Sequence, residues 1–297
     1  MTDPITVPTL LGEYPVTRAL RRGELASQTV HLDFAEVASP AAAFKRVVRG
    51  LEFDVAELAI VTFLIAKAHG KPLVLLPAVV VGRFQHAYIV YNQARGRLTP
   101  GQLSGRRVGV RSYSVTTGVW VRGILTDDWG VDLDRITWVT FEEPHVAEFR
   151  DPPNVQRARP GQDLLGMLLA GEIDAAIVGG HEPPDPRVVP LIPDPASAAQ
   201  AWHAKHGAIQ VNHLVAVTES LARSRPDVVR EVYRLLAESK HAAGLPTGVL
   251  DTTPFGLEAN RRNLEVAIDC VYRQRLIPRR FSVDELFDDV TRGLGAT

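Results

Sequence analysis

Strand-like runs alternate with helix-like runs along almost the whole chain, and this alternation restricts the possible folds more than any other feature. Apolar residues form short continuous or alternating runs in the strand segments and recur at three- and four-residue spacing in the helical segments. Such alternation predicts an α/β fold, in which mostly parallel sheets carry helices on both faces. The first set of expected strands and helices covers residues 5–11, 15–22, 29–34, 40–50, 54–57, 61–69, 73–81 and 86–92.

A second alternating set follows a stretch rich in glycine, proline and polar residues, 93–105. A tail of helices ends the chain, and because such a tail needs a sheet to pack on, we expect it to return to the first set. The prediction is therefore two lobes joined by two crossovers, with a small-molecule cleft between them. Lobe one would comprise residues 1–95 plus 210–297, and lobe two residues 96–209. The expected elements of the second set are 106–110, 115–129, 136–141, 162–171, 174–178, a helix through Trp202 and a strand at 209–217.

Two helix boundaries can be identified from terminal residues. The helix expected at 226–243 opens with Pro226 and stops before Gly244, the residues that favour a helix start and a helix end. A last helix is predicted to begin with a capping box formed by Ser282 and Glu285.

The bulk composition excludes several classes of function. A net charge of −1 without a run of like charges argues against nucleic acid or an anionic membrane surface as the partner. Cys270 is the only cysteine, so no internal disulfide can form. The N-terminal residues do not resemble an export signal, and the longest apolar stretches are too short to span a bilayer. We therefore expect a cytoplasmic protein, with a homo-oligomer left open.

Residues 106–129 predict a binding site for an anion. A short strand runs through hydroxyl-bearing residues into an amphipathic helix, whose first free N–H groups and dipole attract negative charge. We expect Ser114, Thr116 and Thr117 to hold a carboxylate there. The alternative is that Ser112 or Ser114 only caps the helix.

Two histidines near the predicted crossovers are the main candidates for proton transfer. His86 and His213 each lie at or beside a strand, although a hydrogen-bonded core histidine is an equally plausible role for either. Polar residues near the ends of other strands should converge on the same cleft, as in a site built for acid–base chemistry. These residues are Glu13, Tyr14, Thr17, Glu57, Thr62 and Arg83.

Arginines and metal ligands leave further alternatives. Arg18 and Arg122 are candidates for binding a carboxylate, although for Arg122, inside a helix, we favour the interpretation that it is solvated. A metal-dependent lyase using His86, His213 and Glu57 is the weaker hypothesis, because these residues lack a local ligand spacing. We expect no metal and no cofactor.

Several separated blocks of the chain resemble the 4,5-dihydroxyphthalate decarboxylase family. The resemblance implies a type 2 periplasmic-binding-protein-like fold with two lobes that close like a Venus flytrap. It also implies a carbon–carbon lyase that removes a carboxylate from a hydroxylated aromatic dicarboxylic acid. We further expect Asn212, beside His213, to bind the substrate. The blocks are GEYPVTRAL, FDVAEL, FQHAYIVYN, SGRRVGV, GVWVRGILTDDWGVD, NHLVAV, PFGLEANRRNLE and VDELF.

The chain departs from the family pattern at positions expected to line the cleft. Glu13 stands where aspartate is usual, and Gln85 stands where a basic residue is common; RSYSVTT and IQVNH also differ. These differences concern the substrate more than the fold. We expect a cofactor-independent decarboxylase of a small aromatic carboxylate, with Glu13, His86 and His213 as acid and base in the cleft between the lobes. The alternative is a non-catalytic protein that binds an aromatic acid.

Overall fold

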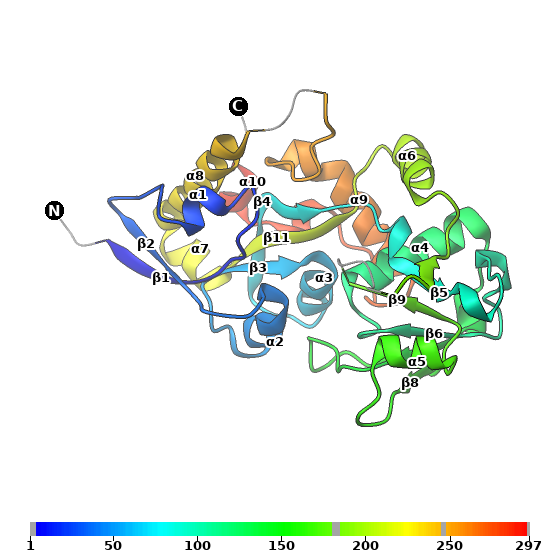
Figure 1. Ribbon diagram of the computed structural model, residues 1–297. Helices are drawn as coiled ribbons and strands as arrows, with labels where there is room; N and C mark the ends of the chain where they lie inside the picture. Colours follow the sequence, from blue (N-terminus) through cyan, green and yellow to red (C-terminus); the bar gives the residue numbers. More distant parts are fainter. Residues whose placement is uncertain (1–3, 180–184, 245–247, 296–297) are drawn as a thin grey trace. The chain divides into compact units, whose positions relative to one another are not determined.

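The computed structural model describes residues 4–179, 185–244 and 248–295, and the chain forms two compact units (Figure 1). Unit 1 contains Met1–Arg83 and Ile209–Thr297, and unit 2 contains Phe84–Ala208. The first crossover thus lies between Arg83 and Phe84, so residue 95, the expected boundary, falls inside unit 2.

Unit 1 is built on a five-stranded sheet in the order β2-β1-β3-β11-β4. β1 runs parallel to β2 and β3, while β11 runs antiparallel to both β3 and β4. The antiparallel strand is the one that brings the chain back from unit 2. The strands are β1 (Ile5–Leu10), β2 (Val30–Phe34), β3 (Val55–Ala59), β4 (Leu73–Gly82) and β11 (Val211–Thr218).

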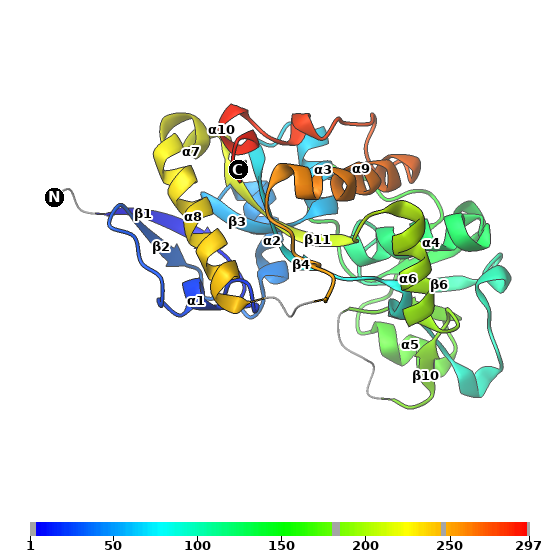
Figure 2. The same cartoon turned by 90° about the horizontal axis from the view of Figure 1, so that it is seen from above.

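Helices cover both faces of this sheet (Figure 1). α1, α7 and α10 pack against α8, and α2 and α9 pack against α3. α8 contacts both edge strands, β2 and β4, so its axis spans the sheet (Figure 2). The helices are α1 (Arg18–Arg21), α2 (Pro40–Gly50), α3 (Ile60–Ala68), α7 (Glu219–Ser224), α8 (Pro226–Ala243), α9 (Leu257–Arg273) and α10 (Asp289–Arg292).

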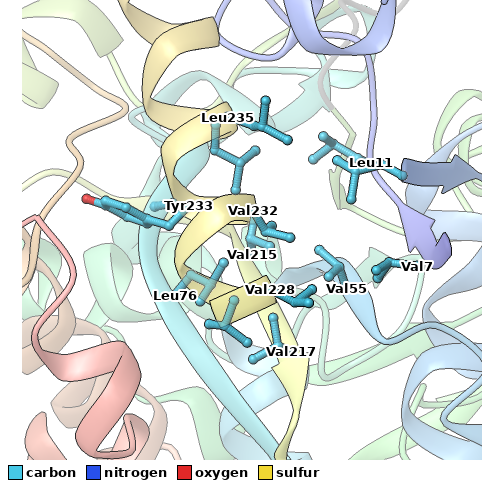
Figure 3. Close-up of a cluster of buried hydrophobic side chains, with 14 of the residues drawn as sticks. Val7, Leu11, Val55, Leu76, Val215, Val217, Val228, Val232, Tyr233 and Leu235 are labelled. Atoms are coloured by element: carbon cyan, nitrogen blue, oxygen red, sulfur yellow. The ribbon is translucent and has the colours of Figure 1, made fainter. Parts of the chain in front are cut away.

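The core beneath α8 is rich in valine. Val55 and Val215 point from neighbouring strands toward Val228 and Val232 of α8 (Figure 3). β-branched side chains pack well on a pleated sheet, and side chains two residues apart along a strand share a face. Glu57, two residues from Val55, and His213, two residues from Val215, therefore lie on the same face as the valines.

Unit 2 is built on a six-stranded sheet in the order β10-β5-β9-β6-β7-β8. β6 to β9 are mutually parallel, and β5 is antiparallel to β9 and β10. α5 packs on the sheet through an apolar cluster that includes Met167 and Leu168. The elements are β5 (Ile89–Asn92), β6 (Arg107–Val110), β7 (Thr137–Thr140), β8 (Val155–Arg157), β9 (Ala175–Ile177), β10 (Val188–Pro190), α4 (Thr116–Trp129), α5 (Leu164–Ala170) and α6 (Pro195–His206).

Two predictions about helix starts were wrong. The N-cap residue of α4 is Val115, which has no side-chain acceptor, so neither Ser112 nor Ser114 caps this helix. The amide and hydroxyl of Ser282 both donate to the Glu285 carboxylate, which is only half of a capping box, and the element that follows is one 3-10 turn, η5 (Asp284–Leu286). The turn does not continue into a helix, because the chain becomes extended at Phe287.

No helix within the described ranges has both the length and the apolar character needed to cross a membrane.

Candidate active site

A locked turn after β1 places the first polar side chain. The hydroxyl of Thr17 donates to the carbonyl of Gly12 at 2.7 Å and accepts from the amide of Tyr14 at 2.8 Å. Thr17 is fully buried, and its amide also donates to the carbonyl of Tyr14 at 3.0 Å. The Tyr14 ring folds back over Gly12, so closely that a Cβ at that position would lie 2.7 Å from the phenol oxygen. The turn therefore aims the Tyr14 hydroxyl at the end of β3.

Glu57 lies at that point, on β3, with none of its side chain exposed. Its Oε2 accepts from the amide of Gly12 at 2.8 Å, and its Oε1 accepts from the Tyr14 hydroxyl at 2.6 Å. A buried carboxylate is costly unless hydrogen-bond donors surround it. The turn after β1 supplies two such donors to Glu57.

His213 of β11 supplies the third donor. β3 and β11 pair antiparallel, with His213 opposite Ala59 and Val215 opposite Glu57, so His213 and Glu57 are diagonal neighbours on one face. Nδ1 of His213 lies 2.5 Å from Oε1 of Glu57. The ring of Phe44 on α2 packs edge-on against the imidazole, with the ring centroids 5.3 Å apart.

The opposite edge of the His213 ring remains available for chemistry. Nε2 makes no hydrogen bond within the described residues, and the side chain is 20% exposed. A carboxylate on one ring nitrogen sets the tautomer and leaves the other nitrogen to exchange a proton. The pair of Glu57 and His213 therefore has the geometry of an oriented acid–base group.

Charges around Tyr14 complete the environment of the pair. Burial and the negative charge of Glu57 raise the pKa of Tyr14 well above its usual value, while the positive charge of Arg83 opposes this shift. Tyr14 is therefore a neutral hydrogen-bond donor at physiological pH. The half-buried Arg83 follows β4, and its amide donates to the carbonyl of Gln210 at 3.2 Å, which ties it to the start of β11.

Glu13 and Arg18, two further predicted site residues, lie at the protein surface. The carboxylate of Glu13 accepts from Arg22 at 2.8 Å and lies 3.8 Å from Arg18, and all three side chains are exposed. Although Glu13 is next to Tyr14 in sequence, the carboxylate that accepts from His213 is that of Glu57. Thr62 in the first turn of α3 and Asn212 on β11 are both buried.

The other predicted residues belong to unit 2. His86 is 1% exposed and lies in the 3-10 turn η1 (His86–Tyr88), where its ring is near the rings of Phe84 and Trp202. Among described residues neither of its ring nitrogens has a hydrogen-bond partner. Burial lowers the pKa of His86 to about 4, against the opposing charge of Asp128. The ring is therefore neutral near pH 7.

The hydroxyl-rich segment lies at the start of α4. Ser114 and Thr116 are buried and Thr117 is half-buried. The hydroxyl of Ser112 is also buried and has no hydrogen-bond partner in the part of the chain that the structure describes.

The interpretation of Arg122 as solvated was wrong, because its side chain is fully buried. The guanidinium lies 3.9 Å from the ring centroid of Tyr113 and 5.3 Å from that of Trp138, and it donates to the Tyr113 carbonyl at 2.8 Å. Aromatic faces accept a guanidinium because it is planar and weakly hydrated. Spacing along a helix does not show such a contact.

The sequence alone did not reveal the roles of Gly12 and Phe44 or the hydrogen bond between Glu57 and His213. One signal for Glu57 was present: it is the only charged residue in VAELAIVTFLIA, a run that reads as buried throughout. An isolated carboxylate in such a run needs a specific partner. Among the described residues no group of three or more His, Cys, Asp or Glu side chains is arranged to hold a metal ion.

Comparison with curated proteins gives two similar sequences. A 4,5-dihydroxyphthalate decarboxylase of Pseudomonas putida is 32% identical over 206 residues, covering 65% of this chain and 79% of that protein. A 4,5-dihydroxyphthalate decarboxylase of Comamonas testosteroni is 28% identical over 246 residues, covering 78% and 74%. No family model matches the chain.

Solved structures show the fold. The periplasmic aliphatic sulphonate binding protein SsuA of Escherichia coli matches with a TM-score of 0.60 and 14% identity, covering 97% of this chain and 98% of that one. The alkanesulfonate-binding protein SsuA of Xanthomonas axonopodis pv. citri matches with a TM-score of 0.57 and 15% identity, covering 97% and 99%. The predicted periplasmic-binding-protein-like α/β fold is confirmed.

Proposed function

Because the chain belongs to the 4,5-dihydroxyphthalate decarboxylase family, we propose that it is a carboxy-lyase acting on a hydroxylated, phthalate-like aromatic acid. The observation that carries the mechanism is the hydrogen bond between Glu57 and His213, together with an Nε2 edge that no described residue occupies with a hydrogen bond. A decarboxylase of this kind needs a group that delivers one proton to a ring carbon, and an oriented histidine is suited to that task.

The proposed reaction replaces carbon dioxide by a proton. The protonated His213 gives its Nε2 proton to the ring carbon that bears the departing carboxylate, while a hydroxyl para or ortho to that carbon donates electron density into the ring. The C–C bond to the carboxylate then breaks, its electron pair restores the aromatic ring, and carbon dioxide leaves. Solvent returns a proton to His213. Because the ring hydroxyl supplies the electrons, we assign no cofactor to the step.

Glu57 acts through His213. Its negative charge lies against Nδ1, so it favours the imidazolium that must form before proton delivery. Placement of one acid–base group typically contributes about 10²- to 10⁴-fold to the rate.

Arg83 is proposed to bind a substrate carboxylate. Its positive charge acts on Tyr14, which binds Glu57, whereas Arg18 lies at the surface. A guanidinium can hold a carboxylate through two parallel hydrogen bonds, which would also orient the aromatic ring.

The experiment is a substrate panel run in heavy water. Purified protein is incubated with hydroxylated phthalates and benzoates, and carbon dioxide and product mass are measured. We expect carbon dioxide from at least one dihydroxyphthalate and one deuterium at the vacated ring position. His213→Gln should lower kcat by about 10²-fold or more. His31→Gln, which changes an exposed histidine on β2, is the matched control and should keep full activity.

The panel also separates catalysis from binding alone. A protein that only binds aromatic acids would show a ligand-dependent rise in melting temperature without carbon dioxide release. That result, or full activity in His213→Gln, would refute the proposal.

A further inference from the structure

Oε1 of Glu57 has two hydrogen-bond donors. Nδ1 of His213 and the phenol of Tyr14 both bind this one oxygen, at 2.5 Å and 2.6 Å, while the Gly12 amide binds the other oxygen. Hydrogen bonds from two donors to one atom compete, because each withdraws electron density from the lone pairs that the other uses. The strength of the contact between Glu57 and His213 therefore depends on Tyr14.

The position of the phenol is built into the turn after β1. Thr17 ties together the Gly12 carbonyl and the Tyr14 amide, and the missing side chain at Gly12 leaves the space that the tyrosine ring occupies. A Cβ on Gly12 would lie 2.7 to 2.8 Å from atoms of that ring, closer than atoms can approach without movement. The ring is thus held over the carboxylate by local hydrogen bonds and steric constraints.

We propose that Tyr14 is a positioning residue that weakens the hold of the Glu57–His213 pair on its proton, by occupying the carboxylate oxygen that His213 also binds. This inference rests on the proposed function only where it predicts rates. With the phenol in place, part of the carboxylate charge is neutralised by a hydrogen bond, so the imidazolium is less stabilised and is a stronger acid toward a ring carbon. Without the phenol, the pair binds its proton more firmly, whichever of the two residues carries it.

The groups around Glu57 and His213 support a direct effect of Tyr14 on this pair. Tyr14 comes from the turn after β1, Glu57 from β3 and Arg83 from the end of β4, and these are the charged or titratable groups shown to act on one another here. α2 contributes the uncharged ring of Phe44. Glu13, Arg18 and Arg22 pair with each other at the surface.

The test is Tyr14→Phe, followed by two measurements. Titration of histidine side chains labelled with ¹⁵N reports the protonation of the pair directly, and the His213 signal is identified by its loss in His213→Gln. We expect the midpoint to move to higher pH by about half a unit to one unit. In the pH–rate profile, the limb on which activity falls with rising pH should move the same way. Tyr272→Phe, at an exposed site on α9, should move neither.

Gly12→Ala is a second variant, which should displace the phenol from Glu57 instead of removing it. The added methyl group should push the ring off the carboxylate and also raise the midpoint, with the phenol still present. An unchanged or lowered midpoint in folded Tyr14→Phe, with only a drop in melting temperature, would overturn the inference and leave a purely structural tyrosine. The two proposals fail separately, because the titration needs no substrate. A raised midpoint in Tyr14→Phe with full activity in His213→Gln would refute the proposed function alone.

Discussion

Glu57 and His213 are separated by 156 positions in the chain, yet their side chains meet at 2.5 Å. β11 returns antiparallel to β3, and the register places the two residues diagonally on one face of the sheet. Val55 and Val215, two residues away on the same strands, point into the apolar core on that face (Figure 3). The acid–base pair thus continues the row of core side chains, which explains how its carboxylate is kept from water.

Glu57→Gln should reduce kcat by about 10²-fold or more, because the amide offers no negative charge to the imidazolium. Steady-state rates of carbon dioxide release measure this effect, and circular dichroism verifies folding. Glu52→Gln, which removes an exposed ion pair with Arg46, is the control and should leave kcat unchanged. Equal rates in Glu57→Gln and wild type would exclude the acid–base role.

Arg83→Gln should raise KM by roughly 10- to 100-fold with a smaller effect on kcat, since a hydrogen bond to a charged group is worth about 1.5–3 kcal/mol. Arg18→Gln should change KM little, because that side chain is exposed and next to Glu13. The same kinetic assay compares the two variants. The reverse ranking would move carboxylate binding to Arg18.

His86 should make stability depend on pH. Its folded pKa of about 4 lies below the usual 6.5, so the unfolded chain binds the proton more readily between these values. Stability is therefore fully present above about pH 6.5 and falls as the pH drops toward 4, by roughly 3 kcal/mol over the whole window. His86→Leu should lose less of its melting temperature between pH 7.5 and pH 5 than wild type does. Parallel losses in both proteins would contradict this account.

The same variant tests whether His86 takes part in the reaction. We expect His86→Leu to retain decarboxylation within a few-fold, because the assigned proton donor is His213. A loss comparable to that of His213→Gln would require a second histidine in the mechanism.

Arg122→Ala should destabilise the protein by about 3–5 kcal/mol, because it leaves a cavity between two aromatic rings and removes the donor to the Tyr113 carbonyl. Arg122→Met, which keeps most of the volume, should cost clearly less. Thermal unfolding of both variants gives the comparison. A similar cost for Met and Ala would show that the charge and its hydrogen bond, not the packing, dominate.

Gly82→Ala should lower the melting temperature, because a Cβ at the end of β4 would overlap the backbone carbonyl oxygen of Thr252. This backbone belongs to the segment that bonds to β4 through Pro254 and Gly256. Gly50→Ala is the matched control: nothing lies within 4 Å of its Cβ position at the end of α2. It should be neutral or stabilising by up to about 1 kcal/mol. A Gly82→Ala protein as stable as wild type would show that the segment moves freely.

Local sequence patterns were sufficient to predict a helix when its terminal residues and its apolar face were both visible in its own segment. The predicted helices 40–50 and 226–243 agree with α2 and α8, because proline, glycine and a one-sided apolar pattern mark both. β8 (Val155–Arg157) was missed, since three residues at a sheet edge with two exposed side chains carry no apolar pattern. The resemblance to the decarboxylase family was also present in the sequence, as separated blocks in a fixed order.

By itself, the sequence determined the α/β alternation, the family and the set of polar residues near strand ends that are candidates for the site. Only the tertiary structure decided that Glu57, rather than Glu13, binds His213, and that Arg122 is buried. The physical reason is that periodicity reports which face of its own element a residue occupies. Strand register and the contacts between elements depend on hydrogen bonds and packing between segments far apart in the chain, and no local pattern encodes them.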